Sequence, residues 1–218
     1  MAPATEIATL SVTGAASLEK EGSPSYNIWH ELLDTIASQD GYQRAYWGRR
    51  IEDQSVVSLL IDWDSVEAHK AFVASREYAP FSTKFGEILE SPAQIHHANL
   101  DPHPPAPAVS SLRSPVTECL TLYFPTSFDR SGFNSSWPIF KKTLEEKADG
   151  FRAVSAGWVV EELELDGGKY QAWAGFLGWD SVDAHMKYRE TEAFKGTIGG
   201  LREGTKAIKA YHAIFEEK

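Results

Sequence analysis

The sequence predicts an α+β fold made of two copies of one β-α-β-β-α-β unit, whose two sheets pack together into one intramolecular barrel. The first observation is an internal repeat, because residues 61–69 and residues 177–185 share Trp-Asp-Ser-Val and Ala-His at the same places. The second is that the strand-like segments are apolar at both parities, so each sheet must be covered on both faces. Helices cover one face, and the sheet of the other copy covers the second face and closes the edges.

The repeat extends over most of the chain. At the same offset and without a gap, Tyr78 pairs with Phe194 and His96 pairs with His212. Between the copies, the segment Asp-Pro-His-Pro-Pro-Ala-Pro has the composition of a semi-rigid, extended tether at the surface. We therefore expect a first unit, a proline-rich linker and a second unit, at residues 1–100, 101–115 and 116–218.

In the first copy, an apolar strand is expected at residues 7–12. A helix follows, because Ser23 and Pro24 form a helix-start signal and large apolar residues recur after them at helical spacing. Gly41 ends this helix. Two strands at residues 42–50 and 56–63 come next, then a helix capped by Asp64 or Ser65, a further helical segment, and a last strand at residues 94–98.

The second copy repeats this order. Strands are expected at residues 117–124, 152–165, 170–179 and 206–215. One helix carries Trp137, Phe140 and Leu144 at helical spacing, and another begins at Ser181. The run Asp-Gly-Gly-Lys after residue 165 indicates a longer hairpin turn, because glycine accepts a positive φ there.

Composition narrows the classes of function. The 218 residues are 42% hydrophobic and 12% aromatic, enough to fill two compact cores, and the net charge of -10 disfavours binding to nucleic acid. The sequence shows no apolar run of the roughly 18–20 residues that a membrane span needs and no signal peptide. A single cysteine, Cys119, lies in an apolar stretch and cannot form an internal disulfide. We therefore expect a soluble, cytoplasmic protein.

The motif Trp-Asp-Ser-Val-x-Ala-His, together with the element order, resembles the ferredoxin-like dimeric α/β barrels and, among them, the antibiotic-biosynthesis-monooxygenase-like (ABM) domains. The resemblance covers both copies and implies a pseudo-dimeric barrel with an aromatic cavity between helices and sheet in each unit. Such domains include cofactor-independent monooxygenases of aromatic polyketides, polyketide cyclases, haem enzymes and stress-response proteins. The segment from Tyr46 to Arg49 also resembles a plant polyketide cyclase, but the position of that enzyme's catalytic histidine is taken by Tyr78 here.

Four residues are predicted to carry catalysis. A histidine, His96 or His69, is the candidate base, because imidazole exchanges protons near neutral pH. Arg44 and Tyr46 are expected to stabilise a developing oxyanion. The competing interpretation is that these histidines only pack in the core. Aromatic residues and histidines of both copies are predicted to bind substrate: Trp47, Phe72, Tyr78, Phe85, Trp173, His185, Tyr188 and His212.

No metal site is predicted, since adjacent strand positions such as His96 and His97 cannot chelate one ion and no Cys/His spacing is present. No cofactor is predicted either, because the chain has no glycine-rich phosphate loop. Haem bound by a single histidine is the weaker alternative.

The leading hypothesis is a cofactor-independent enzyme of secondary metabolism, resembling a monooxygenase or a polyketide cyclase. It would act on a planar, hydrophobic aromatic or polyketide-like molecule by proton transfer, leading to cyclisation, isomerisation, decarboxylation or oxygenation of a carbanion. The alternative is a non-catalytic ligand-binding or stress-response barrel. In either case we expect a small-molecule partner, and a monomer or a homodimer.

Overall fold

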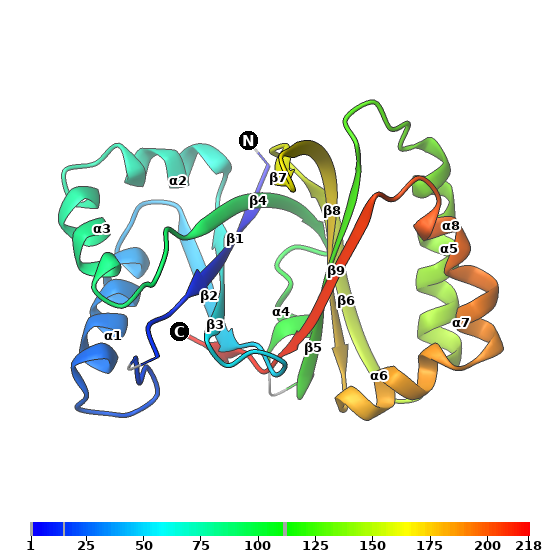
Figure 1. Cartoon of the computed structure of the whole chain (residues 1–218), viewed down its shortest axis with the longest axis horizontal. Helices are drawn as coiled ribbons and strands as arrows, with labels where there is room; N and C mark the ends of the chain where they lie inside the picture. The colour runs from blue at the N-terminus through cyan, green and yellow to red at the C-terminus, as the bar shows by residue number, and fades with distance from the viewer. Residues whose placement is uncertain (1, 15, 111–112) are drawn as a thin grey trace. The chain divides into compact units, whose positions relative to one another are not determined.

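The structure, a computed structural model, describes residues 2–14, 16–110 and 113–218. The chain divides into two compact units, Met1–His97 with Glu216–Lys218 and Ala98–Phe215. In each unit, helices cover one face of an antiparallel sheet (Figure 1). The predicted α+β class and the β-α-β-β-α-β order are confirmed in both units.

The first unit follows the predicted order with small shifts of its boundaries. Its elements are β1 (Ala4–Ser11), α1 (Pro24–Ala37), β2 (Tyr42–Arg49), β3 (Val56–Trp63), α2 (Val66–Val73), α3 (Tyr78–Gly86) and the first half of β4 (Gln94–Asp101). The sheet order is β10-β2-β3-β1-β4, where β10 (Glu216–Glu217) is a short strand from the end of the chain.

Strand parity positions the core of the first unit. In β3, Leu59, Ile61 and Trp63 face the helices and pack in one cluster with Trp29, Leu32 and Leu33 of α1. A bulge between Tyr42 and Arg44 shifts the register of β2. Because of this bulge, Tyr42 packs on the helix side against Trp63, although it is two residues from Arg44.

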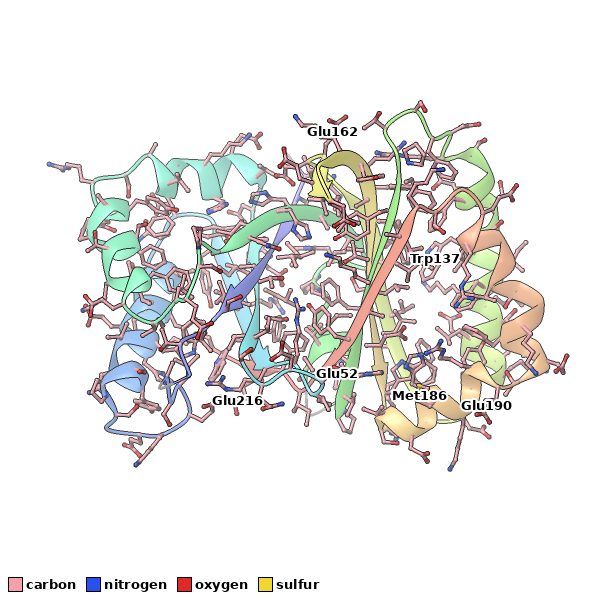
Figure 2. The ribbon with its side chains drawn as sticks, viewed as in Figure 1. Glu52, Trp137, Glu162, Met186, Glu190 and Glu216 are labelled. Atoms are coloured by element: carbon pink, nitrogen blue, oxygen red, sulfur yellow. The ribbon has the colours of Figure 1, made fainter. Side chains whose placement is uncertain are left out.

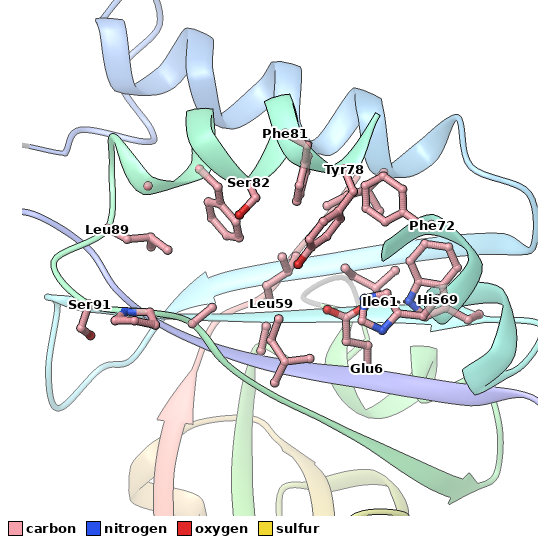
Figure 3. Close-up of a pocket in the computed structure, with 18 of the residues that line it drawn as sticks. Glu6, Leu59, Ile61, His69, Phe72, Tyr78, Phe81, Ser82, Leu89 and Ser91 are labelled. Atoms are coloured by element: carbon pink, nitrogen blue, oxygen red, sulfur yellow. Dashed lines mark hydrogen bonds and ion pairs between the residues drawn. The ribbon is translucent and has the colours of Figure 1, made fainter. Parts of the chain in front are cut away.

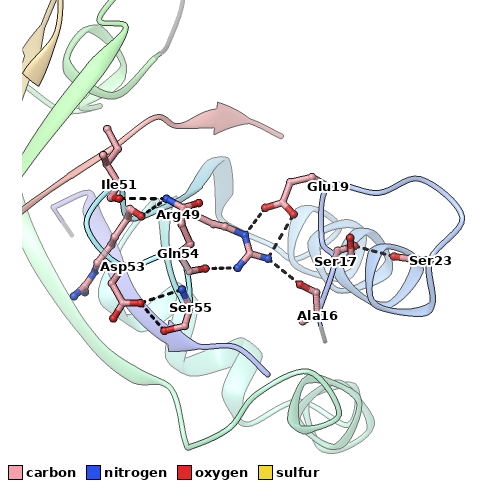
Figure 4. Close-up of polar contacts among 10 residues, drawn as sticks. Ala16, Ser17, Glu19, Ser23, Arg49, Ile51, Asp53, Gln54 and Ser55 are labelled. Atoms are coloured by element: carbon pink, nitrogen blue, oxygen red, sulfur yellow. Dashed lines mark hydrogen bonds and ion pairs between the residues drawn. The ribbon is translucent and has the colours of Figure 1, made fainter. Parts of the chain in front are cut away.

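The loop between β1 and α1 is held by the end of β2. Arg49 binds the Glu19 carboxylate through Nε at 2.6 Å and donates from Nη2 to the Ala16 carbonyl at 2.9 Å (Figure 4). Ser23 donates to the Ser17 carbonyl and caps α1 by accepting from the Tyr26 amide. The helix start predicted from Ser23 is therefore confirmed.

The second unit has the same plan with longer strands. Its elements are β5 (Val116–Pro125), α5 (Ser131–Lys147), β6 (Phe151–Val159), β7 (Leu163–Leu165), β8 (Gly168–Trp179), α6 (Val182–Arg189), α7 (Glu192–Thr197), α8 (Gly199–Arg202) and β9 (Ala207–Ala213). The sheet order is β4-β6-β8-β5-β9, with β7 paired to β8. Asp166 and Gly167 take positive φ in the predicted hairpin turn.

The linker differs from the expected surface tether. Its residues 106–109 form the short helix α4 (Ala106–Val109), and Ala108 and Val109 are buried. Thr117 of β5 donates its hydroxyl hydrogen bond to the Ala108 carbonyl at 2.7 Å. Apolar side chains after the prolines therefore draw this segment into the second unit, which begins in the middle of β4 rather than at residue 116.

Candidate functional site

A cavity of about 530 Å³ lies between the helices and the sheet of the first unit (Figure 3). Its sheet side is formed by Ala8, Leu59 and Ile61, and α3 lies across from them with Phe81 and Phe85. This volume is in the range of pockets that bind small organic molecules. The predicted cavity is therefore present in the first copy.

Helical spacing produces the aromatic wall of the cavity. Tyr78, Phe81 and Phe85 recur in α3 at steps of three and four residues and so share one face of the helix. Phe72 of α2 packs edge-on against Tyr78 and Phe81. The hydroxyl of Tyr78 points from this wall into the cavity (Figure 3).

Polar groups meet at one end of the cavity, where Glu6, Trp63 and His69 line it together. The Trp63 indole N–H donates to Glu6 Oε2 at 2.8 Å, and His69 Nε2 lies 3.5 Å from the same oxygen. The rings of Trp63 and His69 stack at 5.5 Å. His69 is placed here by α2, whose N-cap Ser65 accepts from the Ala68 amide.

A second histidine lies behind His69. His69 Nδ1 and His97 Nε2 of β4 are 2.8 Å apart, so one ring donates a hydrogen bond to the other. His97 is buried and is not among the residues that line the cavity. Glu6, His69 and His97, here called the first triad, thus form a chain that leads from the cavity into the sheet.

The second unit contains the same arrangement, here called the second triad: Glu118, His185 and His212. His185 Nε2 lies 3.3 Å from Glu118 Oε2, and His185 Nδ1 lies 2.8 Å from His212 Nε2. The ring of Trp179 stacks on His185 at 5.0 Å. The repeat therefore preserves a complete carboxyl-histidine-histidine chain with its tryptophan.

In the second triad, burial disfavours the ionised forms of Glu118 and His185. It raises the pKa of Glu118 to about 7, while it lowers the pKa of His185 to about 3 with further contributions from His212 and Arg189. Trp179 opposes the rise of the Glu118 pKa as a nearby donor, although its N–H completes no hydrogen bond of normal geometry. Both shifts favour a neutral carboxyl hydrogen-bonded to a neutral imidazole.

The ligand atoms of the first triad lie within 4.8 Å of one another, close enough to be considered as ligands of one metal ion. Glu6 approaches His69 at Nε2, whereas His97 approaches the same ring at Nδ1. The imidazole therefore stands between the other two residues instead of sharing a centre with them. This geometry fits a hydrogen-bonded chain better than the converging ligands of one ion.

The structure brings together part of the predicted site. His69, Phe72, Tyr78 and Phe85 all line the cavity. His96 does not line it, because it precedes His97 in β4 and strand alternation directs the two side chains to opposite faces.

Arg44, Tyr46 and Trp47 lie elsewhere in the first unit. Trp47 is on the helix side but packs against Trp29, with ring centroids 5.2 Å apart, and does not reach the cavity. Arg44 pairs at 3.7 Å with Asp62, which accepts a hydrogen bond from Thr5 on the sheet face away from the helices. The expected oxyanion contacts from Arg44 and Tyr46 are thus separated from His69 by the sheet.

Burial also controls the titration of this second polar group. It raises the pKa of Asp62 to about 6 and that of Tyr46 to about 12. A phenol with so high a pKa stays protonated near neutral pH, so Tyr46 is no base there.

In the second unit, aromatic rings occupy the space between helices and sheet. Trp173 of β8 packs against Trp137 of α5 at 4.6 Å and against Phe133 at 5.2 Å, and Trp137 lies on the sheet side of α5 (Figure 2). Tyr188 is buried at 5.8 Å from Trp179. Trp173 therefore belongs to a packed core, whereas Tyr188 also lines a pocket of about 460 Å³ with Ala184 and Thr191.

The sequence interpretation missed Glu6, Glu118 and His97. A signal for the two carboxyls was present, since the first strand of each copy contains the pair Thr-Glu at Thr5-Glu6 and Thr117-Glu118. His97 was missed because the ungapped repeat pairs His96 with His212. In the structure His97 takes the place of His212, so the last strand is displaced by one residue, which exchanges its faces.

Comparison with known proteins supports the fold and finds a family match within the first unit. Residues 27–84 match the family described as Antibiotic biosynthesis monooxygenase. The match lies within the first unit. It runs from within α1 to within α3 and includes His69, Phe72, Tyr78 and Phe81, but not Glu6, Phe85 or His97. No curated protein matches the sequence.

Solved structures share the fold over the whole chain. A crystal structure described as an anthrone oxidase-like protein has a TM-score of 0.68 at 16% identity, covering 100% of this chain and 94% of its own. A candidate monooxygenase from Lactobacillus acidophilus has a TM-score of 0.63 at 12% identity, covering 99% of this chain and 94% of its own. These two structures therefore share the fold of both units of this chain. In the described part of the chain, no helix is long and apolar enough to cross a membrane.

Proposed function

We propose that the chain is an enzyme of the monooxygenase-like type that removes a proton from a planar aromatic molecule in the cavity of the first unit. The observation that carries the proposal is the meeting of Glu6 and His69 at the polar end of an otherwise aromatic and aliphatic cavity. The ABM match over the same unit agrees with it.

The lining of the cavity favours a neutral substrate. The charged groups among the lining residues are the acidic Glu6 and Glu90, and no lysine or arginine lines the cavity. An anionic ligand would meet repulsion from these carboxylates without a cation to balance it. A neutral ring system with an acidic C–H or O–H group is attracted by the aromatic walls and can present its proton to Glu6.

Glu6 is the base in this proposal, and Trp63 holds it in place. The Trp63 indole N–H donates to Oε2 and fixes the orientation of the carboxylate, while His69 Nε2 lies 3.5 Å from the same oxygen. Proton abstraction leaves a resonance-stabilised carbanion, which Tyr78 can stabilise by donating a hydrogen bond from the cavity wall. A positioned base of this kind contributes roughly 10²–10⁴-fold to the rate.

The test uses 1,8-dihydroxyanthrone as an enolisable probe, a choice suggested by the anthrone oxidase-like neighbour. Oxygenation of its anion converts the ring CH₂ into a carbonyl. One atom of O₂ enters the ring, and the other leaves as water with the two hydrogens. Absorbance of the quinone and consumption of O₂ report turnover above the spontaneous rate.

The matched variants are Glu6→Gln and Glu118→Gln, which make the same change in the two units. We expect Glu6→Gln to lower kcat/KM by about 10²-fold or more, and Glu118→Gln to retain the wild-type value. Gln keeps an oxygen that can accept from Trp63, so the fold is preserved. Saturable binding of the probe with no turnover by the wild type would instead support a ligand-binding barrel.

A further inference from the structure

We infer that the first triad is a proton relay, in which His97 is the terminal acceptor of the proton that Glu6 takes from the substrate. The inference rests on the proposed function for the role of Glu6, and it assigns to His97 a function that its buried place outside the cavity would not suggest. His97 is a positioning and relay residue, because it does not touch the substrate.

The geometry supplies a continuous path. Glu6 Oε2 and His69 Nε2 are 3.5 Å apart, and His69 Nδ1 and His97 Nε2 are 2.8 Å apart. The two contacts use the two different nitrogens of His69, which is the requirement for passing a proton through an imidazole. Stacking on Trp63 holds the plane of the His69 ring, so both contacts persist together.

Proton counting shows what the relay achieves. When Glu6 holds the substrate proton, one proton moves from Glu6 Oε2 to His69 Nε2 and another from His69 Nδ1 to His97 Nε2. Glu6 is restored as a carboxylate, His69 remains neutral with its proton on Nε2, and His97 carries two ring protons and one positive charge. No ring needs to rotate, and no proton is gained or lost.

The surroundings limit the groups that could take the proton instead. The titratable groups that line the cavity are Glu6 of β1, His69 of α2, Tyr78 of α3 and Glu90 in the segment after α3. His69 Nε2 lies beside Glu6, and His69 Nδ1 lies beside His97. Tyr78 is a weak acid on the opposite wall, and Glu90 is exposed.

The second triad provides an internal control. It has the same contacts, at 3.3 Å and 2.8 Å, and Tyr188 packs 5.8 Å from the ring of Trp179 beside it, whereas the cavity of about 530 Å³ lies at the first triad. A purely structural role for the histidine pair predicts similar consequences when the terminal histidine of either triad is replaced. The relay predicts that only the first triad affects proton transfer.

The experiment compares His97→Gln with His212→Gln, and adds His96→Gln as a neighbour on the opposite face of β4. Gln keeps a donor and an acceptor near His69 Nδ1 but cannot take up a proton. With 1,8-dihydroxyanthrone, we expect His97→Gln to lower kcat by at least about 10-fold with KM within about two-fold, and to move the pH-rate profile. His212→Gln and His96→Gln should retain the wild-type profile.

A second measurement keeps the relay separate from the proposed function. Nitrogen-15 NMR of the ligand-free protein follows protonation of the imidazoles with pH. We expect His97→Gln, but not His96→Gln, to shift the His69 titration by about 0.5 pH unit or more, as coupled groups do. If the wild type shows no turnover but this shift is present, the proposed reaction fails and the relay stands. An unshifted His69 titration, or equal kinetic losses in His97→Gln and His212→Gln, overturns the relay.

Discussion

At the scale of single residues, burial decides which carboxyls are charged. Asp62 and Glu118 both lie in strands with most of their surface removed from water. Burial raises the pKa of Glu118 to about 7 and that of Asp62 to about 6, because the low-dielectric interior disfavours the ionised form. These residues therefore make the stability of the protein depend on pH.

Glu118→Gln tests this dependence. The folded pKa of Glu118 is raised, so its stabilising contribution is complete below the unfolded value near 4.5 and is lost as the pH rises through about 7. His185 acts with the opposite sign, because its folded pKa is lowered to about 3 and stability is lost as the pH falls below about 6.5.

We expect the wild type to lose about 2 kcal/mol more than Glu118→Gln between pH 5 and pH 8. Urea unfolding followed by fluorescence at both pH values measures the difference. Equal losses in the two proteins would show that Glu118 ionises as easily in the folded as in the unfolded chain.

The residues of the candidate site differ in how far the sequence predicts them. His69 follows the cap motif at a fixed distance, so its place on the first turns of α2 could be predicted from local rules. Glu6 lies in an apolar strand, and its hydrogen bond to Trp63 spans residues far apart in sequence. The position of His97 beside His69 depends on the exact register of β4, because a displacement of one residue would put His96 there instead. Local sequence patterns do not predict contacts that depend on strand register or on residues far apart in the sequence.

At the scale of elements, each unit has a close contact between a glycine and a helix. Gly41 precedes β2 with φ at +83°, and a Cβ added there would lie 2.7 Å from the Cβ of Ala68 in α2. Gly150 repeats this arrangement against Ala184 of α6 at 2.8 Å, with φ at +79°. The two glycines let the helix after β3 or β8 approach the turn before β2 or β6.

Gly41→Ala and Gly150→Ala are therefore expected to lower the free energy of unfolding by about 1–3 kcal/mol each. Strain from the positive φ and collision with the facing alanine both contribute. Gly132→Ala in α5 is the matched control, because nothing lies within 4 Å of the added Cβ. Chemical unfolding of the three variants measures the costs. Costs for Gly41 and Gly150 as small as that for Gly132 would contradict this account.

The sequence predicts the helices and strands better than it predicts where they end and how they are connected. The strand at residues 56–63 and the caps at Ser23, Ser65 and Ser181 agree with the structure, because alternation and capping act locally. The prediction that the linker is an extended surface tether was wrong for a physical reason. Its prolines indicated an extended tether, but Ala108 and Val109 gain more from burial in the second unit than from exposure at the surface.

At the scale of the whole molecule, the two copies share their fold and their triads but differ in the space beside them. The first unit keeps a cavity of about 530 Å³ next to Glu6 and His69. In the second unit, Phe133 and Trp137 of α5 pack against Trp173 of β8. The repeat in the sequence predicted the shared fold, whereas the difference in packing follows from large side chains contributed by α5 and β8.

We therefore predict one working binding site per chain. Calorimetry with 1,8-dihydroxyanthraquinone, the product of the probe reaction, measures how many molecules are bound. We expect one molecule bound per chain. Ser82→Trp, which adds an indole at the lining of the cavity on an exposed position of α3, should weaken binding by at least about 10-fold. Its thermal unfolding should match the wild type. Two bound molecules per chain, or unchanged affinity in Ser82→Trp, would contradict a single working cavity in the first unit.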